Sequence, residues 1–219
     1  MSFPDWLEPI RQGAHTIRAQ DISRFVPPEG SDARKGAVLM LFGEGERGPD
    51  VLLTERAHGM RSHPGQVSFP GGSIDETDAS PTAAALREAE EETGLDPSGV
   101  EVFGTLPELW LPPSNFAVTT VLGWWKDPSP VAVVDPAEVH SVLREPIAEL
   151  LDPQHRVTVV HPLGYRGPGF LIGDSKDLIL WGFTAGLISK LFDHVGLTRP
   201  WDASVEQALP DYMFGLGQD

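Results

Sequence analysis

Residues 82–93 are the stretch that most constrains how this chain can fold. They are rich in Ala, Leu, Arg and Glu, which are good helix formers. Ser80 and Pro81 before them suit the cap and the first turn of a helix. Gly94 directly after them suits its end. The sequence therefore predicts a helix over residues 82–93 with a defined start and a defined end.

Carboxylates crowd the second half of this predicted helix. Glu88, Glu91 and Glu92 are spaced at i, i+3 and i+4, so they share one helix face. Three carboxylates on one face can bind hard divalent cations, which prefer oxygen ligands. We expect Arg87, the only cation in this half, to hydrogen-bond a carboxylate, and Glu90 to face solvent. A solvated acidic helix is the alternative, because runs of charge usually lie at the surface.

Length and composition indicate one domain with terminal extensions. The chain has 219 residues, of which 40% are hydrophobic, which is enough for a sizeable core. We expect an N-terminal extension over residues 1–34, a single domain over 35–195 and a C-terminal tail over 196–219. Within the first of these, residues 26–34 are rich in Pro, Gly and Ser and are predicted to be a linker.

The absence of cysteine excludes several kinds of site. Without Cys there is no disulfide framework, thiolate zinc site or Cys nucleophile, and a reducing cytoplasm is compatible with this composition. The chain has no apolar run of transmembrane length, and its first residues do not have the pattern of a secretory signal. We therefore expect a cytoplasmic protein that does not enter a membrane.

Net charge limits the partners of the protein. The formal charge of −16 argues against nucleic acid and against an anionic membrane surface. A small anionic substrate stays compatible with this charge if metal ions and a few placed Arg residues assist its binding. The sequence leaves open whether the chain forms a homodimer.

Short apolar runs with interspersed helices predict an α+β sandwich and not an alternating βαβ fold. A second long helix is expected over residues 177–194, a helical turn over 146–151, and loops over 57–67 and 108–115. The expected strands cover residues 36–43, 51–54, 67–69, 100–106, 116–124, 139–143, 157–162 and 169–172.

The stretch from residue 72 to residue 95 resembles the Nudix box, G-x5-E-x7-R-E-U-x-E-E-x-G-U, in which U is aliphatic. Strict counting back from Arg87 puts Ala79 and Ser73 at the first Glu and Gly positions. A loop one residue longer places Asp78 and Gly72 there instead. The second half of the box matches at Arg87, Glu88, Ala89, Glu91, Glu92, Gly94 and Leu95.

A second resemblance covers residues 52–72, LLTERAHGMRSHPGQVSFPGG. This stretch is similar to the signature of the coenzyme A diphosphatase branch of Nudix hydrolases, LLTxR[SA], then R, then G, then FPGG. The resemblance implies a Nudix-type α/β/α sandwich with a mixed β-sheet and a requirement for Mg²⁺ or Mn²⁺. It also implies hydrolysis of coenzyme A, or of its oxidised or acyl derivatives, to 3′,5′-ADP and 4′-phosphopantetheine or its acyl form.

Two other functions remain alternatives. One is a Nudix hydrolase of another nucleoside diphosphate conjugate, such as ADP-ribose or a dinucleotide. The other is a catalytically silent Nudix module that only binds a ligand. The LLTER and FPGG elements argue against the first alternative, and the intact Glu88, Glu91 and Glu92 argue against the second.

The resemblance assigns roles to particular residues. The expected metal ligands are Glu88, Glu91, Glu92 and the Gly72 carbonyl, with Arg87, Glu91 and Glu92 as catalytic residues. Glu91 or Glu92 is a candidate base, and a loop acid is the alternative. The expected substrate contacts are Arg56, Arg61, His63 and Gln66; for each of them an ordinary surface or structural role is the alternative.

Several residues outside these stretches could also take part. Glu138 and Glu145 could each supply a further metal ligand or base, or be surface carboxylates. Trp110, Trp124 and Trp125 could stack on adenine, although such aromatic residues more often belong to a core or an interface.

Overall fold

The fold is built on a mixed sheet whose two central strands are far apart in the sequence. In the computed structural model, β1 (Arg34–Gly45) and β7 (Phe116–Trp125) pair in parallel, from Arg34 opposite Phe116 to Phe42 opposite Trp124. β2 (Gly48–Arg56) returns antiparallel to β1 and forms a hairpin with it. The structure describes residues 2–25, 32–60, 62–112, 114–162, 164–210 and 213.

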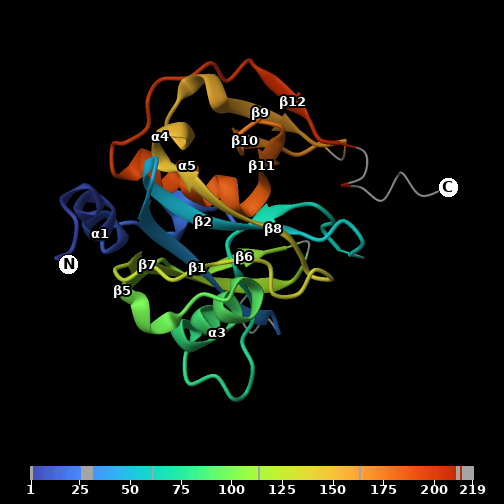
Figure 1. The fold of residues 1–219 in the computed structure, drawn as a ribbon. Coiled ribbons are helices and arrows are strands. Elements are labelled where there is room, and N and C mark those ends of the chain that lie inside the picture. Colours follow the sequence, from blue (N-terminus) through green and yellow to red (C-terminus); the bar gives the residue numbers. More distant parts are fainter. Residues whose placement is uncertain are drawn as a thin grey trace.

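The other elements follow in chain order (Figure 1). Short 3-10 helices cover Asp5–Leu7, Pro97–Gly99 and Pro153–His155. The remaining helices and strands are α1 (Glu8–Ala14), α2 (Ala19–Ile22), β3 (Val67–Ser68), β4 (Gly71–Ser73), α3 (Pro81–Thr93), β5 (Val100–Thr105), β6 (Leu109–Leu111), β8 (Val139–Pro146), α4 (Ile147–Leu150), β9 (Arg156–Val160), β10 (Arg166–Ile172), β11 (Leu178–Leu180), α5 (Gly182–His194) and β12 (Glu206–Ala208).

Two sheets result from the strand pairing. The larger sheet has the order β3-β2-β1-β7-β5, with β4 paired to β1, β6 to β7 and β8 to β2. The smaller sheet has the order β11-β10-β9-β12, in which β12 runs parallel to β9. Each sheet therefore contains both parallel and antiparallel pairs, which agrees with the predicted mixed sheet.

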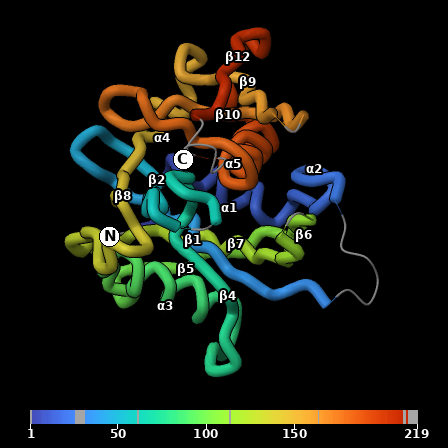
Figure 2. Tube along the Cα trace, turned by 90° about the vertical axis from the view of Figure 1, so that its right-hand side faces the viewer, coloured from blue at the N-terminus to red at the C-terminus, as the bar shows by residue number. Residues whose placement is uncertain are grey.

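Helices cover both faces of the larger sheet. Ala85 and Ala89 of α3 are fully buried in one apolar cluster with Leu39 and Leu41 of β1. On the opposite face, α1 and α5 belong to a second cluster that also contains Phe42. Figures 1 and 2 show α3 below the larger sheet, and α5 with the smaller sheet above it. The predicted α+β sandwich is therefore confirmed.

The start and the end of α3 agree with the sequence prediction. The Ser80 Oγ accepts a hydrogen bond from the Ala83 amide at 3.1 Å. Gly94 adopts a left-handed conformation with φ of 70°, and its amide donates to the Glu90 carbonyl. A residue with a side chain would be strained at this φ. These local contacts determine where the carboxylate-bearing turn of the helix stops.

The predicted long helix over residues 177–194 is wrong in its first part. Leu178–Leu180 form β11, which pairs antiparallel with β10, and α5 begins only at Gly182, which has φ of 68°. A short apolar run has no period that distinguishes a buried strand from one helical turn. Pairing with β10 therefore decides the conformation of Leu178–Leu180.

Other expected loops and extensions contain regular structure. Leu109–Leu111 form β6 against β7 inside the loop predicted over 108–115, and Glu206–Ala208 in the C-terminal tail form β12. In the N-terminal extension, Leu7 and Ile10 are fully buried. Residues 26–31 of the predicted linker lie outside the described residues, whereas Arg34 already belongs to β1.

Among the described residues, no helix is both long enough and apolar enough to span a membrane.

Candidate functional site

The backbone of β4 lies directly against the carboxylates of α3. A Cβ atom added to Gly72 would lie 2.6 Å from the Cδ of Glu88, so glycine leaves room for this carboxylate in its present position. The neighbouring Gly71 amide donates to the Glu92 Oε2 at 3.3 Å. Pairing of β4 with β1, with Gly72 opposite Ala37, holds this backbone in place.

Arg87 links three acidic side chains around this contact. Its Nη1 donates to Glu88 Oε1 and to Glu91 Oε2, both at 2.9 Å. Its Nε and Nη2 donate to the two carboxylate oxygens of Asp78, at 3.1 and 2.9 Å. Nη2 also reaches the Ser73 carbonyl at 3.2 Å. The prediction that Arg87 hydrogen-bonds a carboxylate is confirmed, and the loop acid Asp78 is turned toward Arg87.

The three glutamates differ in their exposure to water. The side chain of Glu88 is 19% exposed and that of Glu91 is 59% exposed. Glu90 on the same helix is exposed, as expected. The pKa of Glu92 is raised to about 7, mainly by burial; the Gly71 amide and Arg56 oppose this rise, while Glu88 and Glu138 add to it. Burial also raises the pKa of Glu88, while hydrogen bonding to Arg87 lowers it.

This donor set fits a hard divalent cation. Like charges that are partly buried destabilise each other unless a cation offsets them, and carboxylate and carbonyl oxygens are the ligands that such ions prefer. Glu88, Glu91, Glu92 and the Gly72 carbonyl could therefore hold one or more ions. The lack of space for a Cβ atom at Gly72 shows independently that the β4 backbone and the Glu88 carboxylate approach each other closely.

Arg56 brings a cation to the same place from the end of β2. Its charge lowers the pKa of Glu92, so the two groups interact electrostatically. Its Nη2 contacts the Met60 sulfur at 3.1 Å. Its Nε is buried and has no hydrogen-bond partner among the described residues. Glu138 belongs to the same surroundings, since its charge raises the pKa of Glu92 and its carbonyl accepts from the Ala57 amide at 2.8 Å.

The loop between β2 and β3 contains the other expected substrate contacts. His63 has φ of 55°, and its pKa is lowered by burial of the ring and by the charge of Arg56. The Gln66 carbonyl accepts from the Arg56 amide at 3.0 Å, while its side-chain nitrogen lies against Gly182 at the start of α5. Arg61 lies outside the described residues.

Glu145 and two of the tryptophans have structural partners of their own. Glu145 is 1% exposed and accepts from the Gly173 amide and the Lys176 Nζ, both at 3.0 Å. Trp124 and Trp125 are buried in the two apolar clusters that cover the faces of the larger sheet. Both rings therefore belong to the core, and the Glu145 carboxylate has the partly buried Lys176 as its partner.

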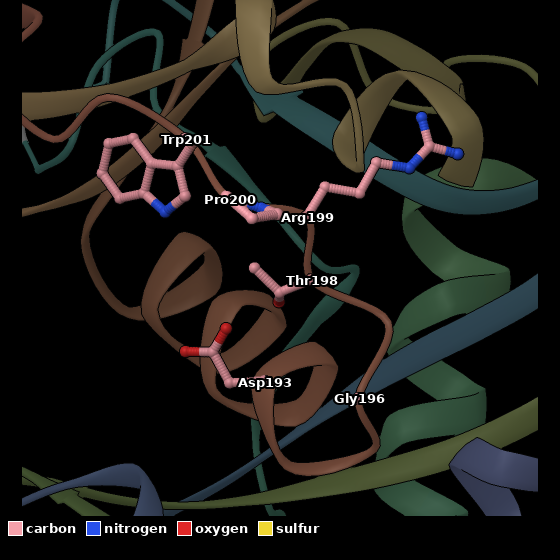
Figure 3. A pocket seen from close by; sticks show the side chains of 6 residues that line it. All are labelled: Asp193, Gly196, Thr198, Arg199, Pro200 and Trp201. Atoms are coloured by element: carbon pink, nitrogen blue, oxygen red, sulfur yellow. The ribbon is translucent and has the colours of Figure 1, made fainter.

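One pocket of the molecule lies elsewhere, at the end of α5 (Figure 3). Its lining contains none of the α3 carboxylates and no residue of the β2–β3 loop. In Figure 3, the Arg199 side chain extends away from Asp193. We therefore do not assign the metal chemistry to this pocket, whose lining residues are Asp193, Gly196, Thr198, Arg199, Pro200 and Trp201.

The match to known proteins covers the part of the chain that contains α3. The model of the NUDIX domain matches residues 32–162. The uncharacterized Nudix hydrolase NudL of Enterobacter sp. (strain 638) is 40% identical over 168 residues, which cover 75% of this chain and 84% of the relative. The protein of the same name from Escherichia coli (strain K12) is 40% identical over 153 residues, which cover 68% and 77% of the two chains.

A solved structure shares the fold. The crystal structure of the Nudix hydrolase RenU from M. smegmatis matches with a TM-score of 0.52 and 19% identity, covering 78% of this chain and 90% of RenU. At this identity the likeness extends to the fold alone.

Proposed function

The chain belongs to the Nudix hydrolase family, and on this basis we propose that it hydrolyses the diphosphate bond of coenzyme A or of its oxidised or acyl derivatives. The expected products are 3′,5′-ADP and 4′-phosphopantetheine or its acyl form. The observation that carries this proposal is the position of Arg56, a partly buried cation beside Glu92 with an Nε that has no hydrogen-bond partner among the described residues.

Arg56 is suited to bind one anionic oxygen of the diphosphate. A guanidinium forms strong, directional hydrogen bonds to phosphate oxygens. Arg56 belongs to the LLTER segment of the signature, and its amide is held by the Gln66 carbonyl of the following loop. The residue that would recognise phosphate is therefore tied to the loop that we propose to select the rest of the substrate.

The α3 carboxylates supply the second part of the site. We assign Glu88, Glu91, Glu92 and the Gly72 carbonyl as the residues that hold Mg²⁺ or Mn²⁺. When bound, such an ion supplies charge neutralisation at the diphosphate and activation of the attacking water. This assignment is supported by the oxygen donor set and by the close approach of Gly72 to Glu88.

Proton transfer falls to a carboxylate of the same helix. Glu92 is more buried than the exposed Glu91, and a carboxylate held beside the reacting water is a suitable proton acceptor. We assign the proton to Glu92 Oε1, because Oε2 accepts from the Gly71 amide. Water adds to one phosphorus, the bond from that phosphorus to the bridging oxygen breaks, and the second phosphate leaves with this oxygen.

Arg87 and Asp78 position the carboxylates in this scheme. Arg87 donates to Glu88 and Glu91 through one nitrogen and to Asp78 through two others. Asp78 is thereby engaged, which makes it a poor candidate for the base. We assign Arg87 to orienting Glu88 and Glu91, without contact to the reacting atoms.

A panel of substrates followed by phosphorus NMR tests the proposal. Coenzyme A, its oxidised form, an acyl derivative, ADP-ribose and a dinucleotide should be compared at equal concentration with Mg²⁺ or Mn²⁺. We expect the coenzyme A compounds to be cleaved fastest, giving 3′,5′-ADP. Faster cleavage of ADP-ribose or of the dinucleotide would overturn the choice of substrate. Turnover by E92Q equal to that of the unmodified protein would overturn the catalytic assignment.

A further inference from the structure

We propose that Glu55, His58 and His140 form a second metal site, which binds a divalent ion of the zinc class. Glu55 lies near the end of β2, His58 follows in the next loop, and His140 lies at the start of β8. One ligand atom from each residue can be chosen so that all of them lie within 4.8 Å of one another. None of these residues belongs to α3 or to β4, which carry the carboxylate site described above.

The Glu55 carboxylate is buried and already oriented toward the two imidazoles. Its side chain is 5% exposed, and its Oε1 lies 2.8 Å from the His58 Nε2. Its Oε2 accepts a hydrogen bond from the Ser141 Oγ at 2.8 Å. This hydrogen bond from Ser141 fixes the orientation of the Glu55 carboxylate. Hydrogen bonds to the ligands of protein-bound metals have the same effect.

An irregularity in the β2–β8 pairing places His140 beside these groups. Glu55 pairs with Ser141 and Arg56 pairs with Val139, so His140 lies between two paired residues without a partner on β2. Such a bulge changes the direction of a side chain from the one that regular alternation along the strand would give it. The His140 ring meets the His58 ring at a centroid distance of 4.7 Å and an angle of 66°.

The chemistry of these three residues points to a different ion from that expected at α3. Two imidazoles and one carboxylate suit Zn²⁺, Co²⁺ or Ni²⁺, whereas Mg²⁺ prefers oxygen ligands alone. His140 is exposed and the His58 side chain is 45% exposed, so an ion can enter from solvent and keep a water ligand. A bound ion would link His58, at the start of the β2–β3 loop, to His140 of β8.

Zinc titration by calorimetry in excess Mg²⁺ tests the site on the full chain. We expect one Zn²⁺ per chain for the unmodified protein and at least about tenfold weaker binding for H140A, since even outer-shell changes cost about 10–100-fold in affinity. Because His140 is exposed, H140A should fold, which circular dichroism would verify. H15A, which removes another exposed histidine, should bind zinc as the unmodified protein does. Absent zinc binding, or equal affinity for H140A, would overturn the proposal.

Cobalt absorption spectra separate this site from the α3 carboxylates. We expect the visible bands of four- or five-coordinate Co²⁺ in the unmodified protein and in E92Q, and their loss in both E55Q and H140A. If E92Q abolished these bands while H140A retained them, the ion would belong to α3 and the proposal would fail. This readout does not depend on hydrolysis, so failure of the proposed enzyme activity would leave it interpretable.

Discussion

Asp78 accepts two hydrogen bonds from Arg87, at 3.1 Å from Nε and at 2.9 Å from Nη2. The side chain of Asp78 is 6% exposed, although it lies in the loop before α3. Hydrogen bonding to Arg87 holds the pKa of this carboxyl group below its usual range. The pair therefore keeps the guanidinium turned toward Glu88 and Glu91 at neutral pH.

The first prediction concerns this pair. We expect D78N to lower kcat by at least about tenfold, as loss of an outer partner does at other metal sites, with a smaller change in KM. D78E, which keeps the charge, should recover part of kcat. Steady-state kinetics with coenzyme A at saturating metal would measure both values.

Asp75 offers a matched control in the same loop. It lies 3.7 Å from Arg87 and its side chain is 62% exposed, so D75N should leave kcat nearly unchanged. An equal loss for D75N and D78N would show that loop charge in general, and not the bidentate pair, supports the reaction.

The second prediction concerns the close approach of Gly72. In G72A, the new Cβ would meet the Glu88 carboxylate at 2.6 Å, and this flexible side chain would have to move. We expect a small effect on stability but a loss of affinity for Mn²⁺ of about tenfold or more, measured by calorimetry.

Gly186 in α5 is the control glycine, because a Cβ there meets nothing within 4 Å. G186A should bind Mn²⁺ normally and gain up to about 1 kcal/mol of stability from better helix propensity. Normal Mn²⁺ affinity in G72A would argue against Glu88 and Gly72 as partners in one metal site.

The third prediction concerns the ionisation of Glu92 in the metal-free protein. The pKa of Glu92 is raised from 4.5 to about 7 in the folded state, so the folded chain holds this proton more tightly than the unfolded chain. Stability therefore falls as pH rises from about 4.5 to about 7 and then levels off. E92Q has no carboxylate to ionise, so it should be more stable than the unmodified protein by about 3 kcal/mol near pH 8.

Thermal denaturation in EDTA at several pH values would measure this difference. It should shrink toward zero as the pH falls below about 4.5, where Glu92 is protonated in both the folded and the unfolded chain. E90Q, which alters an exposed glutamate of the same helix, should show no such pH dependence. A constant difference between E92Q and the unmodified protein across this range would contradict the assigned cause.

The fourth prediction separates Glu145 from the metal site. Glu145 is 1% exposed and is bound by Lys176 and by the Gly173 amide, so E145Q removes the buried one of the two carboxylates that bind Lys176. We expect a loss of about 2 kcal/mol in the free energy of unfolding, because Lys176 keeps Glu149 as a charge partner, with an unchanged affinity for Mn²⁺.

Glu149 provides the comparison, since it also binds Lys176, at 2.9 Å, but its side chain is 35% exposed. E149Q should lower the free energy of unfolding by no more than about 1 kcal/mol. Chemical denaturation of both variants would test this order, and weaker Mn²⁺ binding by E145Q would return Glu145 to the list of metal ligands.

The fifth prediction concerns Arg56. Loss of a charged hydrogen bond to the diphosphate in R56Q should raise KM for coenzyme A by about 10–100-fold. R166Q, which alters an exposed arginine paired with Glu206, should leave KM unchanged. An unaltered KM in R56Q would remove Arg56 from the substrate site.

Local sequence determined the helix that carries the carboxylates. Ser80, Pro81 and Gly94 set the ends of α3 through contacts within a few residues, and helical geometry alone places Glu88, Glu91 and Glu92 on one face. These properties depend on sequence neighbours, so they could be predicted without knowledge of the fold. The family resemblance and the mixed α+β architecture followed from the same stretch and from the spacing of apolar runs.

Only the tertiary structure decided what these carboxylates meet. The approach of Gly72 to Glu88 depends on the β4–β1 register, and the position of Arg56 near Glu92 depends on where β2 ends in the sheet. The Glu55, His58 and His140 cluster likewise requires the bulge between β2 and β8. Strand register joins residues that are tens of positions apart, and no local pattern in the sequence encodes it. The sequence thus determined a helix able to bind a cation, while the sheet decided which groups surround that helix.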